Sequence, residues 1–327
     1  MNSTGLSIIK TLGCMTAVTF FTIYNTWDRF DYDYHWILGL LTFISTIATP
    51  LFFVVAGYLD AQTRHDANWQ IGKIKSVVIV FLFWVTVYYV WEPYQRGYLI
   101  QPWFIFALIV IYTFHPLIAW LSQRRGLFVA VLLTLLCCSY GYDLLSVIYP
   151  DRHLFSLPPQ YRLWTWLLFY LTGQLFNDPK VAEWIRNPQV IKGSIIALPF
   201  VYLFTWFYER HFFFALFKAD RNAFILTGSQ IYILIVLLVI AANAVQFKKN
   251  REWKEAVLAT VSKAMTGVYI LHYRVSPAGD AHPCAFASHQ VGGNSADLCP
   301  VGAHFPCRAL QYAAQEGDYL VTDNGTI

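Results

Sequence analysis

Charged side chains are scarce in this sequence: Asp, Glu, Lys and Arg make up 13% of the 327 residues, whereas 57% are hydrophobic. A soluble domain has about 25% charged residues, so a share of half that size is typical of a chain that lies in lipid. The few cations are spread over many short segments and form no basic patch of the kind that binds nucleic acid. The composition therefore predicts an integral membrane protein that is surrounded by membrane lipids and has no nucleic-acid partner.

Metal-binding patterns are also missing. None of the 6 cysteines forms a CxxC pair or stands at zinc-ligand spacing from a histidine, so we expect no metal site. A secretory signal is absent too: the first apolar run is long, begins with little positive charge and is followed by no small-residue cleavage site. We expect this run to be retained as the first span.

Long apolar runs, by contrast, are abundant. A membrane-crossing helix needs roughly 20 such residues. Nine segments approach that length, which predicts an all-α polytopic membrane helix bundle of about nine spans. The segments lie at about 6–24, 36–59, 74–92, 103–122, 126–149, 160–177, 191–208, 224–247 and, more weakly, 255–273.

The positive charges indicate how these spans are oriented. Cytoplasmic loops of membrane proteins carry more Lys and Arg than outer loops. Here the segments that join even to odd spans carry most of them, for example 64–75 and 180–192. The pattern predicts a cytoplasmic N-terminus, although the cations of 210–221 depart from it.

The second run closes with a distinctive stretch, Pro50-Leu-Phe-Phe-Val-Val-Ala-Gly-Tyr58, and no charged residue occurs from Ile37 to Leu59. Pro50 predicts a kink that neighbouring helices can accommodate. Gly57 allows another helix to come close. We therefore expect a kinked span with one closely packed face.

Ionisable side chains within or beside the spans are candidates for function because lipid penalises them. His115 lies in the fourth run three residues after Tyr112, so the two share a helix face. Arg162 precedes the sixth run, and His272 closes the ninth. Two plainer interpretations stay open: a neutral imidazole bonded to a neighbouring helix, and an arginine that reaches out to the interface. Asp143, near the outer end of the fifth run, is expected to be interfacial.

The pattern changes after Tyr273. Residues 274–327 contain no run long enough to cross a membrane and no helical or strand period. We expect a membrane domain over 1–273 and a weakly ordered, non-membrane tail over 274–327. A shifted reading frame would explain the abrupt change, and an intact frame in an undisturbed copy of the locus would remove that hypothesis.

Several segments, in this order and spacing, resemble signatures of the acyltransferase-3 family of integral-membrane O-acyltransferases. The stretch from Pro50 to Tyr58 resembles that family's Pro-Leu-Phe-Phe segment, with Ala56 where serine is usual. Gln101-Pro-Trp-Phe, followed by Tyr112, is similar to its His-Leu-Trp-Phe segment, with glutamine at the first position. Later signatures are matched by Arg162-Leu-Trp-Thr-Trp and Gly267-Val-Tyr-Ile-Leu-His272, so that the likeness covers about 6–273.

The resemblance implies a membrane O-acyltransferase of the bacterial inner membrane. Such an enzyme moves an acyl group, commonly acetyl, from cytoplasmic acyl-CoA (acetyl-CoA) to a hydroxyl of a cell-surface or lipid-linked glycan, without a metal or prosthetic group. The reaction needs cations for the CoA phosphates, a base for the hydroxyl proton and donors for the oxyanion.

These needs select the candidate site residues. We rank His272 first as base, because it falls near the outer end of its span, and His115 second, because it lies deeper. The full set comprises His272, His115 and Arg162 for catalysis, Lys10, Lys73 and Lys75 for the CoA phosphates, and Gln101, Trp103 and Tyr112 for the substrate.

The chain departs from the family in its first span, where an arginine and, further along the same helix face, a histidine are usual. The matching positions hold Lys10 and Phe21. Lysine keeps a charge but lacks the bidentate fork of arginine, and phenylalanine accepts no proton. This departure favours an alternative, a catalytically inactive family member that acts as a partner in glycan assembly. A glycolipid transporter or flippase ranks third, because the sequence lacks paired, Gly- or Pro-broken helices in two matching halves.

Overall fold

A computed structural model describes residues 2–26, 35–63, 67–91, 103–148, 162–207, 231–245 and 253–262. These residues are almost entirely α-helical and include no strand, which confirms the predicted all-α class. The predicted tail, Gln101 and His272 lie outside them. The helices are α1 (Ser3–Thr26), α2 (His35–Ser45), α3 (Ala48–Asp60), α4 (Ala67–Trp91), α5 (Trp103–Thr113), α6 (His115–Ser122), α7 (Arg125–Ile148), α8 (Leu163–Leu175), α9 (Pro179–Arg186), α10 (Pro188–Phe207) and α13 (Tyr232–Ala242), and 253–262 is also helical.

Several of these helices suit a membrane. In the described part of the chain, Phe43–Asp60, Arg125–Leu145 and Pro188–Phe207 are long and apolar enough to cross one. α5 and α6 make a fourth candidate if the bend of 62° between them lies within a single span. The apolar helices agree with an integral membrane protein, while the count of about nine spans and the cytoplasmic N-terminus stay predictions.

The second predicted run is interrupted before Pro50 rather than at it. α2 ends at Ser45 and α3 begins at Ala48, and the hydroxyl of Thr46 bonds the carbonyl oxygen of Phe43 at 2.7 Å within the turn. Pro50 thus falls in the first turn of α3, where a backbone N–H would have no partner within the helix. The expected kink at Pro50 is therefore displaced towards the N-terminus by a few residues.

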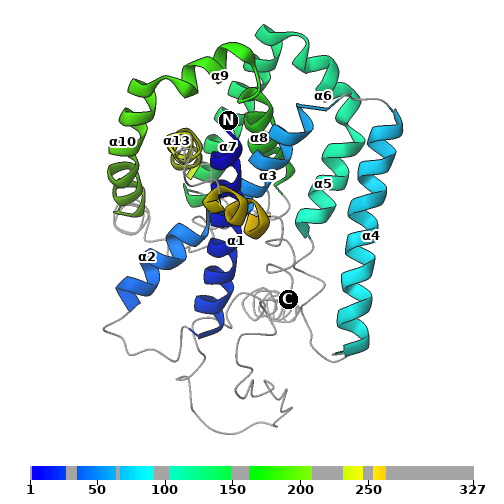
Figure 1. Ribbon diagram of the computed structural model, residues 1–327, viewed down its shortest axis with the longest axis horizontal. Coiled ribbons are helices and arrows are strands. Elements are labelled where there is room, and N and C mark those ends of the chain that lie inside the picture. Colours follow the sequence, from blue (N-terminus) through cyan, green and yellow to red (C-terminus); the bar gives the residue numbers. More distant parts are fainter. Residues whose placement is uncertain are drawn as a thin grey trace, which may run out of the picture.

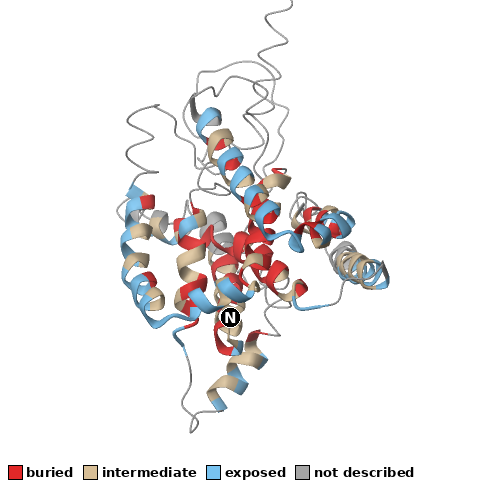
Figure 2. Ribbon diagram, turned by 90° about the horizontal axis from the view of Figure 1, so that it is seen from above, coloured by how far each residue is buried: buried red, intermediate tan, exposed pale blue. Residues whose placement is uncertain are grey.

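α8 forms the centre of the bundle. Most of its residues are buried and none is exposed, and α3 and α8 pack on each other more extensively than any other pair of described helices. α1 packs on the other side of α3, and α7 packs on α8. Figure 1 shows α3 and α8 in the middle with α4 and α10 on opposite flanks, and in Figure 2 the buried residues gather in the centre. Apolar side chains of the flanking helices are exposed, among them Phe83 and Phe204, as a lipid-facing surface requires.

Two glycines let α3 and α8 approach closely. A Cβ added to Gly57 would collide with the carbonyl oxygen of Tyr170, and one added to Gly173 would collide with the carbonyl oxygen of Val54. The predicted role of Gly57 in close packing is therefore confirmed. Such backbone proximity is the usual way in which membrane helices gain packing energy.

Most of the cations in the part of the chain that the structure describes gather at one end of the bundle. The contacts that join helix termini there are Asn2–Asn243, Asn177–Ala61 and Arg125–Asp178. We call this end, formed by the start of α1 and the junctions α3–α4, α6–α7 and α8–α10, the basic end. It carries Lys73, Lys75, Arg124, Arg125, Lys180, Arg186 and Lys192. The segments that are rich in Lys and Arg in the sequence therefore lie together at one end of the described bundle.

Replacement of Gly57 by alanine should destabilise the protein by at least about 2 kcal/mol, because the new methyl group meets backbone rather than a movable side chain. Thermal unfolding in detergent measures the effect. Gly193→Ala is the matched control: no atom lies within 4 Å of the added Cβ, and alanine favours the helix, so stability should stay equal or rise. Equal stability of the two variants would contradict the close α3–α8 contact.

Candidate functional site

A buried carboxylate lies at the basic end. Asp60, the last residue of α3, is 1% exposed. The ammonium nitrogen of Lys73 on α4 lies 2.8 Å from its Oδ1, and the hydroxyl of Tyr170 on α8 donates a hydrogen bond of 3.0 Å to its Oδ2. The hydroxyl of Tyr112 on α5 also interacts with this carboxylate. Three helices thus supply the charge and the donors that make burial of Asp60 tolerable.

Aromatic contacts extend this group of side chains to a histidine. The ring of Trp69 lies 5.4 Å from the ammonium nitrogen of Lys73, 6.2 Å from the ring of Tyr112 and 4.5 Å from the imidazole of His115. His115 itself is only 2% exposed. We call the connected residues Asp60, Trp69, Lys73, Tyr112, His115 and Tyr170 the Asp60 cluster.

The break between α5 and α6 positions two members of this cluster. Pro116 has no N–H, so the carbonyl of Tyr112, four residues earlier, loses its helical partner. The side-chain amide of Gln70 replaces it, donating to the carbonyl oxygens of Tyr112 at 2.8 Å and Thr113 at 3.0 Å. The helix predicted over 103–122 is therefore broken between Thr113 and His115, with a bend of 62° between α5 and α6. Even so, the side chains of Tyr112 and His115 meet the same partner, Trp69.

A second buried polar group lies at the opposite end of α8. Arg162, which precedes α8, pairs with Asp143 of α7 at 2.5 Å, and the two residues are 6% and 2% exposed. The guanidinium also stacks over the ring of Tyr142, 4.7 Å from its centroid. Asp143 is buried inside the bundle, where the neighbouring helix supplies the cation that neutralises its carboxylate, while its predicted place near the membrane interface stays a prediction. Arg162 itself points into the bundle instead of reaching out to the interface.

An aromatic layer separates the two polar groups. Trp166 stacks on Phe53 of α3 with ring centroids 5.2 Å apart and contacts Phe169 at 6.4 Å. Tyr170 follows Arg162 by eight positions on α8, which corresponds to about 12 Å along the axis. One buried helix therefore carries a polar group at each end and aromatic side chains between them.

The other candidates from the sequence are more scattered. Lys10 is half-buried on α1, and Lys75 is exposed on α4 at the basic end. α5 begins at Trp103, at the end opposite to Tyr112. The structure thus brings together Lys73, Tyr112 and His115 and sets Arg162 apart from them. The sequence analysis did not select three members of the Asp60 cluster: Asp60, Trp69 and Tyr170. Only Asp60 could have been found from the sequence, because it is the charged residue that follows the uncharged stretch 37–59.

A bundle of apolar helices that buries an imidazole and a carboxylate, with an ammonium group paired to that carboxylate, is typical of a membrane protein whose ionisable groups take part in function. The family comparison makes this more specific: the acyltransferase domain of the acyltransferase-3 family matches residues 12–276, most of the chain and all helices of both polar groups. The chain belongs to the acyltransferase-3 family. Comparison with curated proteins and with solved structures gives no match.

Removal of one partner from the Arg162–Asp143 pair should destabilise the protein strongly. Arg162→Gln leaves a buried carboxylate without its cation, and such losses cost about 3–5 kcal/mol. Arg125→Gln is the matched control, because it breaks an ion pair of 3.5 Å whose arginine side chain is 46% exposed, and the cost should stay within about 1 kcal/mol. Thermal unfolding in detergent measures both. The double variant Asp143→Leu, Arg162→Met should recover much of the loss, since it leaves no unpaired charge.

Proposed function

We propose that this acyltransferase moves an acyl group, acetyl in the simplest case, from acyl-CoA to a hydroxyl of a cell-surface or lipid-linked glycan in the bacterial inner membrane. Family membership supplies the acyl transfer, whereas the donor, the acceptor and the membrane are the proposal. The observation that carries it is the Asp60 cluster, where a buried network at the basic end combines an imidazole, an ammonium group and two phenols.

The basic end suits the donor. The phosphates of acyl-CoA need cations, and this end holds the exposed Lys75 as well as Lys73, whose side chain stays 37% exposed while it pairs with Asp60. The carboxylate fixes the position of the Lys73 ammonium, and an ammonium group has three donor hydrogens, so contact with a phosphate is still open to it. Lys10 on α1 is the remaining cation that we assign to the donor.

The chemistry requires a base near the reacting hydroxyl. The base removes the hydroxyl proton, the oxygen attacks the thioester carbonyl, and the C–S bond breaks so that CoA leaves as a thiol after taking up the proton. His115 is the buried imidazole of the described residues at the basic end. His272 stays the first candidate at the acceptor side, where Arg162, Gln101 and Trp103 are expected to contact the glycan together with Tyr112 deeper in the bundle.

One feature favours a second candidate function. Phe21 lies within α1 where the family usually has a histidine, so the base of the first span is missing. A protein that keeps the bundle and has lost catalysis would act as a partner in glycan assembly. A glycolipid transporter is the third possibility.

Membranes that contain the protein should transfer label from acyl-CoA to glycan, and His272→Ala should lower the rate by at least about a hundredfold, as loss of a general base does. His115→Ala should lower the rate of acyl transfer by a similar factor if an imidazole near the bound acyl-CoA also takes part in the reaction. Leu133→Ala, a change at an exposed position of α7, controls for insertion and should keep the full rate. If both histidine variants transfer acyl groups at the full rate, neither His272 nor His115 is the base. If the unchanged protein transfers no acyl group, the proposed enzyme activity is wrong.

Phe21→His should raise the rate of acyl transfer, because it returns an imidazole to the first span. The same radiolabel assay measures the gain, with Phe21→Leu as a control that changes the side chain without adding a base. A gain in the histidine variant alone indicates a degenerate acyltransferase. No gain, together with an inactive parent, favours the non-catalytic partner.

A further inference from the structure

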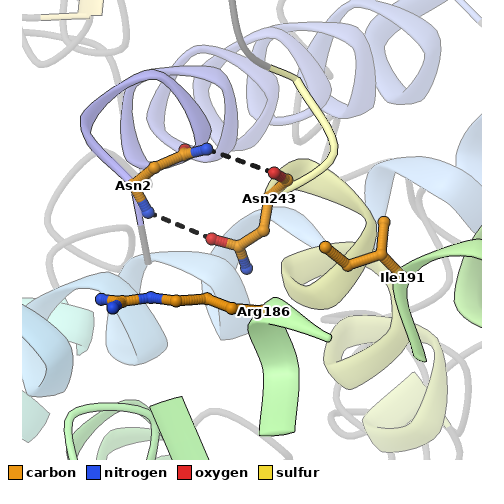
Figure 3. A pocket seen from close by; sticks show the side chains of 4 residues that line it. All are labelled: Asn2, Arg186, Ile191 and Asn243. Carbon is orange, nitrogen blue, oxygen red and sulfur yellow. Dashed lines mark hydrogen bonds between the residues drawn. The ribbon is translucent and has the colours of Figure 1, made fainter. Parts of the chain in front are cut away.

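A cavity of about 210 Å³ lies at the basic end, and its lining includes no residue of the two polar groups described above. It is lined by Asn2 before α1, Arg186 at the end of α9, Ile191 near the start of α10 and Asn243 after α13 (Figure 3). None of these residues belongs to the Asp60 cluster or to the candidates for acyl transfer. The cavity therefore needs an explanation of its own.

Two of the lining residues form a fixed wall. The backbone N–H of Asn2 donates to Oδ1 of Asn243 at 3.1 Å, and the side-chain amide of Asn2 donates to the carbonyl oxygen of Asn243 at 3.2 Å (Figure 3). The side-chain amide of Asn243 donates in turn to the carbonyl oxygen of Val239 at 3.1 Å. These amides hold α1 against α13, so they shape the cavity and are largely occupied with each other.

Arg186 differs from them. The ion pairs among the described residues are Lys73–Asp60, Arg125–Asp178 and Arg162–Asp143, and Arg186 takes part in none of these. It is exposed, and Figure 3 shows its side chain extended beside the asparagine pair. A guanidinium has five N–H donors in a planar fork that matches two oxygens of a phosphate. The chemistry of the cavity thus favours a phosphate ester.

The position of α9 indicates where that phosphate comes from. Asp178 caps the helix by accepting from the backbone N–H groups of residues 180 and 181, and Ile185 anchors it with 0% exposure. In Figure 1 α9 runs across the same end of the bundle as the N-terminus. Trp184 is 54% exposed on its outer side. A short amphipathic helix with an outward tryptophan and flanking cations is typical of the boundary between the apolar layer and the headgroups.

We propose that this cavity binds the phosphate of an anionic phospholipid headgroup, with Arg186 as its ligand. Ile191 gives the cavity an apolar wall for the carbon atoms next to the phosphate. The site depends only on residues of the basic end, so it stands independently of the proposed acyl transfer.

The test uses the full chain in detergent and follows its thermal unfolding during titration with short-chain phosphatidylglycerol or with phosphatidylcholine of equal chain length. Phosphatidylglycerol should bind more tightly, and Arg186→Gln should weaken its binding about fivefold, the effect of losing one cation near a phosphate. Lys180→Gln is the matched control: it removes the same charge from the same helix outside the cavity and should leave the affinity close to that of the unchanged protein.

Three outcomes would overturn the proposal. Equal affinity for the two lipids would show that the net negative charge of the headgroup is not recognised. An equal loss of affinity in Arg186→Gln and Lys180→Gln would show that the lipid is attracted by the positive charge of the helix in general and not by the cavity. Glycerol 3-phosphate provides the third arm. If it binds as tightly as phosphatidylglycerol and loses binding in Arg186→Gln, the ligand is a soluble phosphate ester and the lipid assignment fails.

Discussion

The backbone contact between α3 and α8 is the constraint on which the rest of the structure depends. Gly57 lies against the carbonyl of Tyr170, and Gly173 lies against that of Val54. Asp60 follows Gly57 by three positions, so the same close approach that packs the two helices brings the phenol of Tyr170 within 3.0 Å of the carboxylate. Without it, the buried carboxylate of Asp60 would lose the phenol of Tyr170 and keep only the cation of Lys73 and the phenol of Tyr112 as partners.

Each buried carboxylate of the two polar groups in this bundle is paired with a positively charged side chain. Asp60 pairs with Lys73 at the basic end, and Asp143 pairs with Arg162 at the other. Asp143 and Arg162 join the packed neighbours α7 and α8, whereas Lys73 reaches Asp60 from the second turn of α4, and each carboxylate is almost completely buried. An isolated charge in lipid is expensive. The pairs therefore couple helix packing to electrostatics, and the aromatic layer between them keeps the two groups chemically separate.

This division suits a reaction whose two substrates come from opposite sides of a membrane. The basic end combines cations with a buried imidazole, while the far end of α8 presents an arginine that is already held by a carboxylate. Phe21 stands against full activity, because α1 lacks the imidazole that the family usually places there. The family match covers 12–276 in spite of Phe21, so membership of the family does not depend on a histidine in the first span.

The sequence by itself determined the class of protein, the presence of several apolar helices, the gathering of cations at alternate loops and the family. Composition, run length and local motifs express these properties directly. It also placed Tyr112 and His115 together, because their spacing is local. Only the tertiary structure decided the partners of buried charges: Tyr170 and Asp60 are separated by 110 positions, and the cation beside the buried Asp143 comes from Arg162 at the start of the neighbouring helix. Which residue neutralises a buried charge depends on which helices lie side by side. The apolar runs have similar hydrophobicity, so a run by itself does not indicate which other helix it will pack against.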